Sequence, residues 1–264
     1  MLLNLIIRGA TVVKIIAHRG FSGIAPENTM AAFERAIAIK ADGIECDVHL
    51  SKDGKIVICH DTTLMRTTNG SGSIQDYTWD ELQAFDAGSW FSPEFSKERI
   101  PSLERLLKLV RKTDLLLNIE LKTETIFYPQ IEEKVVALLK KFDLVDHSLI
   151  SSFNFQSLSK VKVLLPELAT AALIKYPQEV INFWEQMSAL KVNAIHPCYL
   201  GLTTDIMDKA EKRGFQINTW TPDQPEEISH LLKLQTHGII TNFPEKAQQI
   251  LRQEKGVNSE TSRD

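Results

Sequence analysis

The chain has 264 residues, of which 43% are hydrophobic and 24% charged, as in an ordinary soluble globular protein. Its formal net charge of −4 provides no basic field for nucleic acid, and no uncharged run reaches the roughly 18 residues of a membrane span. Arg8 interrupts the apolar start, which lacks the basic region and the cleavage site of a signal peptide. The three cysteines lie in apolar context and suit a reducing compartment. We therefore expect a cytoplasmic protein without nucleic-acid binding or stable membrane insertion.

Short β-rich runs alternate with helical patterns along most of the chain. The predicted strands cover residues 14–17, 43–49, 56–59, 115–121, 149–152, 170–174, 194–197, 215–219 and 238–241. The predicted helices cover residues 29–41, 103–112, 131–142, 156–165, 179–190, 204–214 and 226–234. About eight βα units favour one closed (β/α)8 barrel over residues 1–264. An open, doubly wound sheet is the alternative. Gly43 and Gly214 suit the left-handed position after a helix.

Residues 61–101 interrupt this alternation, with little strand signal and many Gly, Ser, Thr and aromatic side chains. The spacing of Thr78 and Glu81 is typical of a capping box and predicts one short helix. A connection of this length is either functional or disordered, and its aromatic residues favour a packed insertion over one end of the scaffold. The polar residues 254–264 are expected to fray as a tail.

The loop at 18–29, HRGFSGIAPENT, joins the first predicted strand to the first predicted helix. Turns of this kind carry the chemistry of α/β proteins. His18 can move a proton near neutral pH, and Arg19 can hold a phosphate through two parallel hydrogen bonds. Asn28 or Thr29 can cap the helix that follows.

Three acidic side chains lie on predicted strands. Glu45 and Asp47 are two residues apart on one strand, so both point to the same side, and Glu120 ends another strand. A carboxylate at the end of a buried strand is costly unless it is paired or binds a metal. Oxygen ligands without a thiol favour Mg²⁺ or Ca²⁺ and do not distinguish the two. The alternative is that each carboxylate pairs with a lysine or an arginine.

Three further polar or aromatic side chains lie where predicted strands end. His60 follows the strand at 56–59, and Asp61 could orient its imidazole; alternatively the two form a surface pair. Lys122 shares a strand face with Glu120 and could neutralise a phosphate oxygen, or it is a solvated lysine. Trp220 could form one wall of a pocket or pack into the end of the barrel.

Together these segments resemble the glycerophosphodiester phosphodiesterase family. The matching pieces, in the family's order, are His18-Arg19-Gly20, Pro26-Glu27-Asn28-Thr29, Ile44-Glu45-Cys46-Asp47-Val48, Ser51-Lys52-Asp53-Gly54, His60-Asp61, Arg66-Thr67-Thr68 with Gly70, Ile100-Pro101-Ser102-Leu103, Asn118-Ile119-Glu120-Leu121-Lys122, Ser152-Phe153, Asn218-Thr219-Trp220-Thr221 and Gly238-Ile239-Ile240-Thr241. They span residues 15–244, nearly the whole chain. Asn242 departs from the pattern, because the family often has Asp there.

The resemblance implies a (β/α)8 TIM barrel with a small insertion after the second barrel strand, in agreement with the break at 61–101. It also implies the roles of eight side chains: His18 and His60 as general base and acid, Glu45, Asp47 and Glu120 as metal ligands, Arg19 and Lys122 as phosphate contacts and Glu27 as a brace for the His18 loop. Trp220, as one wall of a pocket, is a further candidate substrate contact.

The implied reaction is the metal-dependent hydrolysis of glycerophosphodiesters to glycerol 3-phosphate and an alcohol. Three carboxylates, a divalent cation, Arg19 and Lys122 sum to a charge of about +1, which complements a phosphodiester. Two other functions stay open. A lysophospholipase D-type phosphodiesterase needs an apolar entry, for which residues 2–7 are the only candidate in the sequence. A catalytically silent phosphate-ligand binding protein is disfavoured, because both histidines and all three acids are present.

Overall fold

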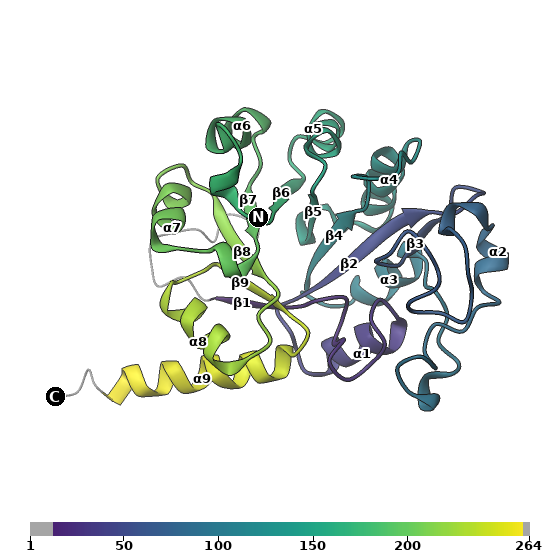
Figure 1. The fold of residues 1–264 in the computed structure, drawn as a ribbon, viewed down its shortest axis with the longest axis horizontal. Helices are drawn as coiled ribbons and strands as arrows, with labels where there is room; N and C mark the ends of the chain where they lie inside the picture. Colours follow the sequence, from purple (N-terminus) through teal and green to yellow (C-terminus); the bar gives the residue numbers. More distant parts are fainter. Residues whose placement is uncertain (1–12, 261–264) are drawn as a thin grey trace.

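The computed structural model describes residues 13–260, with side chains up to residue 254. Its strands are β1 (Lys14–Ala17), β2 (Gly43–Leu50), β3 (Ile56–Ile58), β4 (Leu116–Leu121), β5 (Ser148–Ser152), β6 (Ala169–Ile174), β7 (Ala194–Pro197), β8 (Gln216–Trp220) and β9 (Gly238–Thr241). All except β3 pair in parallel, and the pairing of β1 with both β9 and β2 closes them into a barrel (Figure 1). The barrel prediction is therefore confirmed over the open sheet. The strand β3 pairs antiparallel with β2 outside the barrel.

Helices surround the barrel and connect its strands (Figure 1). They are α1 (Met30–Ala38), α2 (Trp79–Leu82), α3 (Leu103–Val110), α4 (Ile131–Phe142), α5 (Phe155–Leu164), α6 (Phe183–Leu190), α7 (Thr204–Glu211), α8 (Pro225–Lys233) and α9 (Pro244–Glu260). The sequence did not predict α9, because it is polar and Ala247 is its one fully buried hydrophobic residue in the described part. No helix among the described residues combines the length and the apolar character needed to cross a membrane.

Two glycines after predicted helices turn out to have different roles. Gly214 has a φ of +75° and ends α7 as predicted. Gly43 does not have a positive φ, so the prediction of a left-handed residue there was wrong. It opens β2, where a Cβ would lie 2.8 Å from the carbonyl oxygen of Leu116, so glycine permits the close approach of β2 and β4. The left-handed residue after α1 is Lys40, with a φ of +55°.

The barrel interior is filled by layers of side chains from alternate strands. A layer is followed by moving to the paired residue on the neighbouring strand and then one residue toward its carboxyl end. From Glu45 this path passes through Ser151, His196 and Ile240, on every second strand, and returns to Glu45. The next layer toward the carboxyl ends contains His18, Glu120, Leu173 and Trp220. Small apolar side chains fill the amino-terminal end of the barrel, namely Leu149, Ala169, Ala171 and Ala194. The charged residues are thus confined to the carboxyl-terminal half.

The connection between β3 and α3 is a packed insertion beside β2 and α1 (Figure 1). It has a small core of its own, formed by Val57, Cys59, Leu64, Ile74, Leu82, Ala87 and Ile100. The predicted capping box is present, since the Thr78 hydroxyl accepts a hydrogen bond from the Glu81 amide and the Glu81 carboxylate accepts one from the Thr78 amide. This core holds the insertion against the carboxyl-terminal end of the barrel, where the polar layers of the interior lie.

Candidate active site

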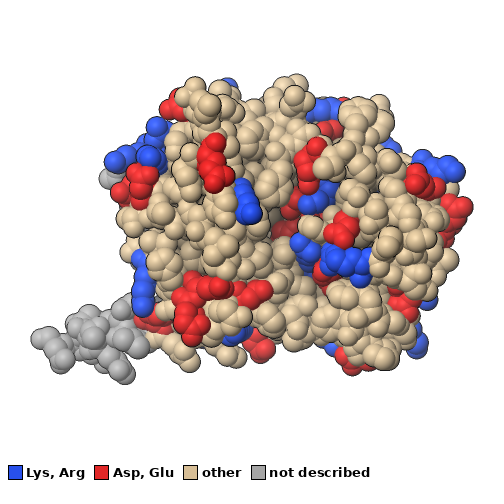
Figure 2. Space-filling model, in the orientation of Figure 1, with Lys and Arg blue, Asp and Glu red and all other residues tan. Residues whose placement is uncertain are grey.

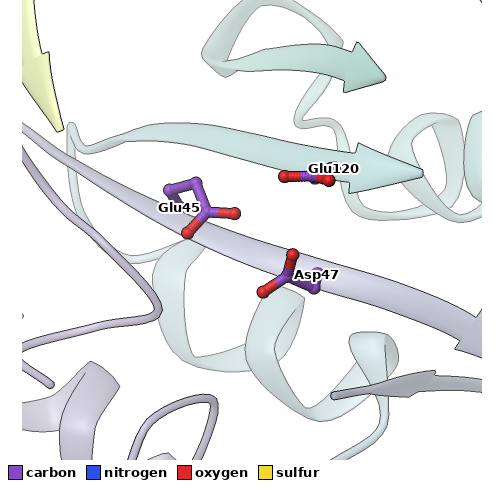
Figure 3. A group of neighbouring side chains, drawn as sticks. All are labelled: Glu45, Asp47 and Glu120. Carbon is purple, nitrogen blue, oxygen red and sulfur yellow. The ribbon is translucent and has the colours of Figure 1, made fainter. Parts of the chain in front are cut away.

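Three carboxylates meet at the carboxyl-terminal end of the barrel. Glu45 and Asp47 of β2 and Glu120 of β4 are 3%, 1% and 9% exposed, and one oxygen from each lies within 4.8 Å of the others. Figure 3 shows the three groups facing one another across the two strands. Burial and mutual repulsion raise the pKa of Glu45 well above its usual value and that of Glu120 to about 7. The cluster therefore requires nearby positive charge to ionise fully.

The unpaired oxygens of this cluster fit a hard cation. Glu45 Oε2 accepts a hydrogen bond from the Arg19 amide at 2.8 Å, and Asp47 Oδ2 accepts one from Asn28 Nδ2 at 2.8 Å. Glu45 Oε1 and Asp47 Oδ1 are buried without a hydrogen-bond partner. Buried, unpartnered carboxylate oxygens beside a third carboxylate are the donor set that a divalent cation takes. The residues present therefore fit a divalent metal ion.

Two basic side chains share the cluster, so the ion-pair alternative is correct in part. Lys122 Nζ lies 2.7 Å from Glu120 Oε1 and 3.8 Å from Asp47 Oδ1, and Arg19 Nε lies 3.5 Å from Asp47 Oδ2. Although burial opposes it, these carboxylates raise the pKa of Lys122. The two positively charged side chains face three acidic ones, which leaves one negative charge uncompensated when all three acids are ionised. In that state the cluster therefore still has a charge that a divalent cation can compensate.

His18 is held by the loop that follows β9. Its Nδ1 lies 2.7 Å from Asn242 Oδ1, and the Asn242 side-chain amide donates to Asp223 at 2.7 Å. Because Asp223 fixes the orientation of this amide, the oxygen faces His18, so Nδ1 carries the proton and Nε2 has the lone pair. Burial and the nearby Arg19 guanidinium lower the pKa of His18 to about 4. The imidazole is therefore neutral at pH 7.

His60 lies at the base of the insertion, and its surroundings are charged. Its Nδ1 is 2.6 Å from Asp61 Oδ1, and its Nε2 is 3.5 Å from Lys122 Nζ. The predicted contact between His60 and Asp61 is thus present, and it belongs to the site rather than to the surface alone. Asp61 also accepts a hydrogen bond from Arg66 Nε at 2.7 Å. Hydrogen bonds from Arg66, together with His60, hold the pKa of Asp61 far below its usual range despite partial burial.

Glu27 connects the His18 loop with the insertion. It accepts a hydrogen bond from Arg19 at 2.7 Å and two from Arg66, at 2.8 and 2.7 Å. Arg19 has a left-handed φ of +55°, which directs its amide to Glu45 while its side chain reaches Glu27. The sequence assigned no role to Arg66, because nothing in its local pattern shows that it reaches Glu27, 39 residues away.

Trp220 ends β8 in the same layer as His18 and Glu120. Its indole Nε1 donates to the carbonyl of His196 at 2.8 Å, and its ring packs edge to face on Phe153 with 5.9 Å between centroids. The nine predicted site residues therefore converge at one barrel end. Figure 2 shows acidic and basic side chains gathered around a hollow in this face.

Comparison with known proteins agrees with this geometry. Residues 18–246 match the Glycerophosphoryl diester phosphodiesterase family. The chain is 40% identical over 238 residues to a glycerophosphodiester phosphodiesterase of Caldanaerobacter subterraneus, covering 90% of this chain and 97% of that protein. It is 38% identical to a glycerophosphodiester phosphodiesterase of Bacillus altitudinis, with 92% and 100% covered.

Solved structures show the same fold. A phosphodiesterase of Oleispira antarctica in complex with the product sn-glycerol-3-phosphate superposes with a TM-score of 0.82 at 30% identity, covering 91% of this chain and 97% of that one. A glycerophosphodiester phosphodiesterase of Thermotoga maritima has a TM-score of 0.71 at 28% identity, with 88% and 96% covered. The chain therefore belongs to the glycerophosphoryl diester phosphodiesterase family and is an enzyme of this class.

Proposed function

We propose that the protein hydrolyses glycerophosphodiesters to glycerol 3-phosphate and an alcohol, with a divalent cation bound by Glu45, Asp47 and Glu120. The observation that carries this proposal is the convergence of three buried carboxylates, one oxygen of each within 4.8 Å of the others, at the barrel end that also holds His18 and His60. The Oleispira relative, which was solved with sn-glycerol-3-phosphate, supports the substrate class. The cation is Mg²⁺ or Ca²⁺, since both take oxygen ligands.

Arg19 and Lys122 are the proposed phosphate contacts. Arg19 Nε is buried without a hydrogen-bond partner, although Asp47 Oδ2 lies 3.5 Å away and the Nη1 of the same side chain is held by Glu27. A buried donor that lacks an acceptor favours an anionic ligand, because an unsatisfied polar group is costly. Lys122 Nζ lies between Glu120 and His60, where it can also meet a phosphate oxygen. In this proposal Glu27 braces Arg19 for the contact.

The two imidazoles are proposed to move protons in opposite directions. His18 is neutral with its lone pair on Nε2, so it can take the proton of the attacking hydroxyl. That hydroxyl belongs either to water or to the glycerol 2-position, and in the second case water then opens the resulting cyclic phosphate. Asp61 accepts a hydrogen bond from Nδ1 of His60 and fixes the orientation of the ring, so a proton on Nε2 of His60 can pass to the leaving alcohol. A bound divalent cation would supply charge stabilisation at the phosphoryl group and lower the pKa of the attacking hydroxyl.

Trp220 is the proposed wall for the leaving alcohol. Its hydrogen bond to the His196 carbonyl and its contact with Phe153 fix the ring at the end of β8. An aromatic face held in this way attracts a quaternary ammonium group. We expect a higher kcat/KM for glycerophosphocholine than for glycerophosphoinositol, and equal values would contradict an ammonium site at Trp220.

We further propose that the enzyme works in the cytoplasm. Cys46, Cys59 and Cys198 are all free and buried. Unpaired thiols are usual in reducing compartments, whereas secreted domains of modest size commonly carry disulfides. Cell fractionation with an antibody against the chain tests this location.

The decisive experiment measures release of glycerol 3-phosphate from glycerophosphocholine after chelation and stepwise return of Mg²⁺ or Ca²⁺. We expect no turnover without metal and full turnover with the preferred ion. Calorimetric titration of the same metal-free protein measures binding of each ion independently of turnover. A protein that binds phosphate ligands and metal but never releases glycerol 3-phosphate would be the silent binding protein instead.

A further inference from the structure

His49 is a buried histidine of β2 that has no part in the proposed proton transfers. It lies on the same side of the strand as Glu45 and Asp47, because the three residues are two apart. β2 runs past the barrel to the insertion, where its last residues pair with β3 (Figure 1). The His49 ring is fully buried there, with Nε2 3.2 Å from the backbone carbonyl oxygen of His60 and Nδ1 2.9 Å from Tyr128 Oη. The ring therefore joins the backbone of His60 to the connection after β4.

The chemistry of the three groups fixes which of them donates. A carbonyl oxygen can only accept, so Nε2 of His49 carries a proton and donates to His60. Burial lowers the pKa of His49 to about 4, so the ring is neutral at pH 7 and its lone pair is on Nδ1. The hydroxyl of Tyr128, itself only 4% exposed, therefore donates to Nδ1. In this way Tyr128 selects the tautomer of His49 that binds the His60 carbonyl.

This contact holds the backbone of His60, whereas Asp61 and Lys122 contact its ring. The strand β3 ends at Ile58, and the amide of the next residue, Cys59, still donates to the carbonyl of β2 residue 47 at 3.0 Å. At His60 the backbone is held by a side chain instead. Because that side chain comes from the strand that carries two of the acidic residues, the contact sets the position of His60 relative to the acidic cluster.

We propose that His49 and Tyr128 are positioning residues for His60: Tyr128 sets the tautomer of His49, and His49 holds the His60 backbone where its imidazole can give a proton to the leaving alcohol. This inference rests on the proposed function and adds two residues to it. A misplacement of about 1 Å can lower a rate about a hundredfold, so a lost contact to the backbone of His60 should be visible in kcat. A histidine that served packing alone would affect stability without acting through His60.

The test uses the full chain with its preferred metal ion and two substrates that differ in their need for an acid. Choline must be protonated as it leaves glycerophosphocholine, whereas 4-nitrophenolate leaves the 4-nitrophenyl ester of glycerol 3-phosphate without a proton. We expect kcat for glycerophosphocholine to fall about tenfold in Tyr128→Phe and up to about a hundredfold in His49→Leu. For the nitrophenyl ester we expect a loss below about threefold in both variants, because no acid is needed. His60→Ala should show the same difference between the substrates.

Two further variants serve as controls. In His49→Gln the side-chain amide can still donate to the His60 carbonyl, so kcat for glycerophosphocholine should stay within about threefold of wild type. Tyr199→Phe is the matched control for Tyr128→Phe, because the Tyr199 hydroxyl donates to Glu227 at 2.7 Å without a contact to His49 or His60. It should turn over like wild type. Calorimetric affinity for the metal ion should be unchanged in Tyr128→Phe and in His49→Leu.

A double variant separates this inference from the proposed function. Once His60→Ala has removed the imidazole, Tyr128→Phe should lower kcat no further, because no ring is left to position. Tyr128→Phe that turns over like Tyr199→Phe, loses equally on both substrates, weakens metal binding about tenfold or adds its full loss to that of His60→Ala would overturn the inference. The hydrolysis of glycerophosphocholine by wild type would still stand. His60→Ala with the turnover of wild type would instead overturn the proposed acid, and this inference with it.

Discussion

The two sides of the site hold their histidines in contrasting environments. On the β1 side, His18 contacts a neutral amide, Asn242, and burial keeps its pKa near 4. On the insertion side, His60 is 32% exposed and contacts a carboxylate, Asp61, which is itself held by Arg66. The neighbours of each ring, rather than the ring itself, underlie the proposal that one imidazole accepts a proton and the other gives one.

Removing either imidazole should have the largest effect and tests whether both sides are needed. His18→Ala or His60→Ala should lower kcat at least about a hundredfold, because a positioned acid or base contributes typically 10²–10⁴-fold. The barrel should remain folded, so thermal unfolding and calorimetric metal binding serve as controls. Turnover close to normal in both variants would refute the proposed acid and base.

The acidic cluster between the two sides should show a conflict between stability and activity. Burial and the repulsion of Asp47 and Glu120 raise the pKa of Glu45. The protonated form is therefore favoured in the folded state, and stability is lost as pH rises through the folded pKa. Without metal at pH 8, Glu45→Gln should raise the free energy of unfolding by ~1–3 kcal/mol while turnover with metal falls at least a hundredfold.

Urea unfolding with a chelator at pH 8 and at pH 4 measures this effect. At pH 4 the wild-type carboxyl should be largely protonated in both states, so the gain from Glu45→Gln should disappear there. A variant that loses stability at pH 8 in the absence of metal would contradict the assigned repulsion. Such a loss would mean that the Arg19 amide stabilises the charged carboxylate more than its neighbours destabilise it.

The contrast between the histidines can be reduced by giving His18 a charged partner. In Asn242→Asp, a carboxylate beside Nδ1 should raise the pKa of His18 from about 4 by about one to three units. The acid limb of the kcat/KM profile should then move to higher pH, because more of the imidazole is protonated and unable to accept. Turnover at pH 8 should change less than tenfold.

Asp223 provides the control for this exchange. It accepts from the Asn242 amide, so Asn242→Asp places two carboxylates in contact. Adding Asp223→Asn restores the hydrogen bond between positions 223 and 242 and should keep or enlarge the shift in the acid limb. An acid limb that stays in place in both variants would show that His18 does not need its lone pair during the reaction.

The same contrast explains what the sequence could predict. The strands and α1–α8, apart from the four-residue α2, follow from apolar periodicity, and α2 follows from its capping box, because these signals are local. The contacts that distinguish the two histidines are not local: His18 and Asn242 are 224 residues apart, and Arg66 and Glu27 are 39 apart. Family resemblance predicted the reactive side chains, yet Asn242 was noted only as a departure from the family's pattern. Its effect on His18 depends on the amide orientation set by Asp223, which no sequence pattern shows.

The smallest expected effect concerns Arg66, which links the two sides through Glu27 and Asp61. Arg66 is 44% exposed, and exposed ion pairs contribute about 0–1 kcal/mol, so Arg66→Gln should change unfolding by no more than that. Asp61 still contacts His60, so kcat should fall less than tenfold. Lys108→Gln, at an exposed ion pair of α3, is the matched control. A loss as large as that of His60→Ala would instead place Arg66 on the substrate, because bracing alone leaves His60 and its partner in contact.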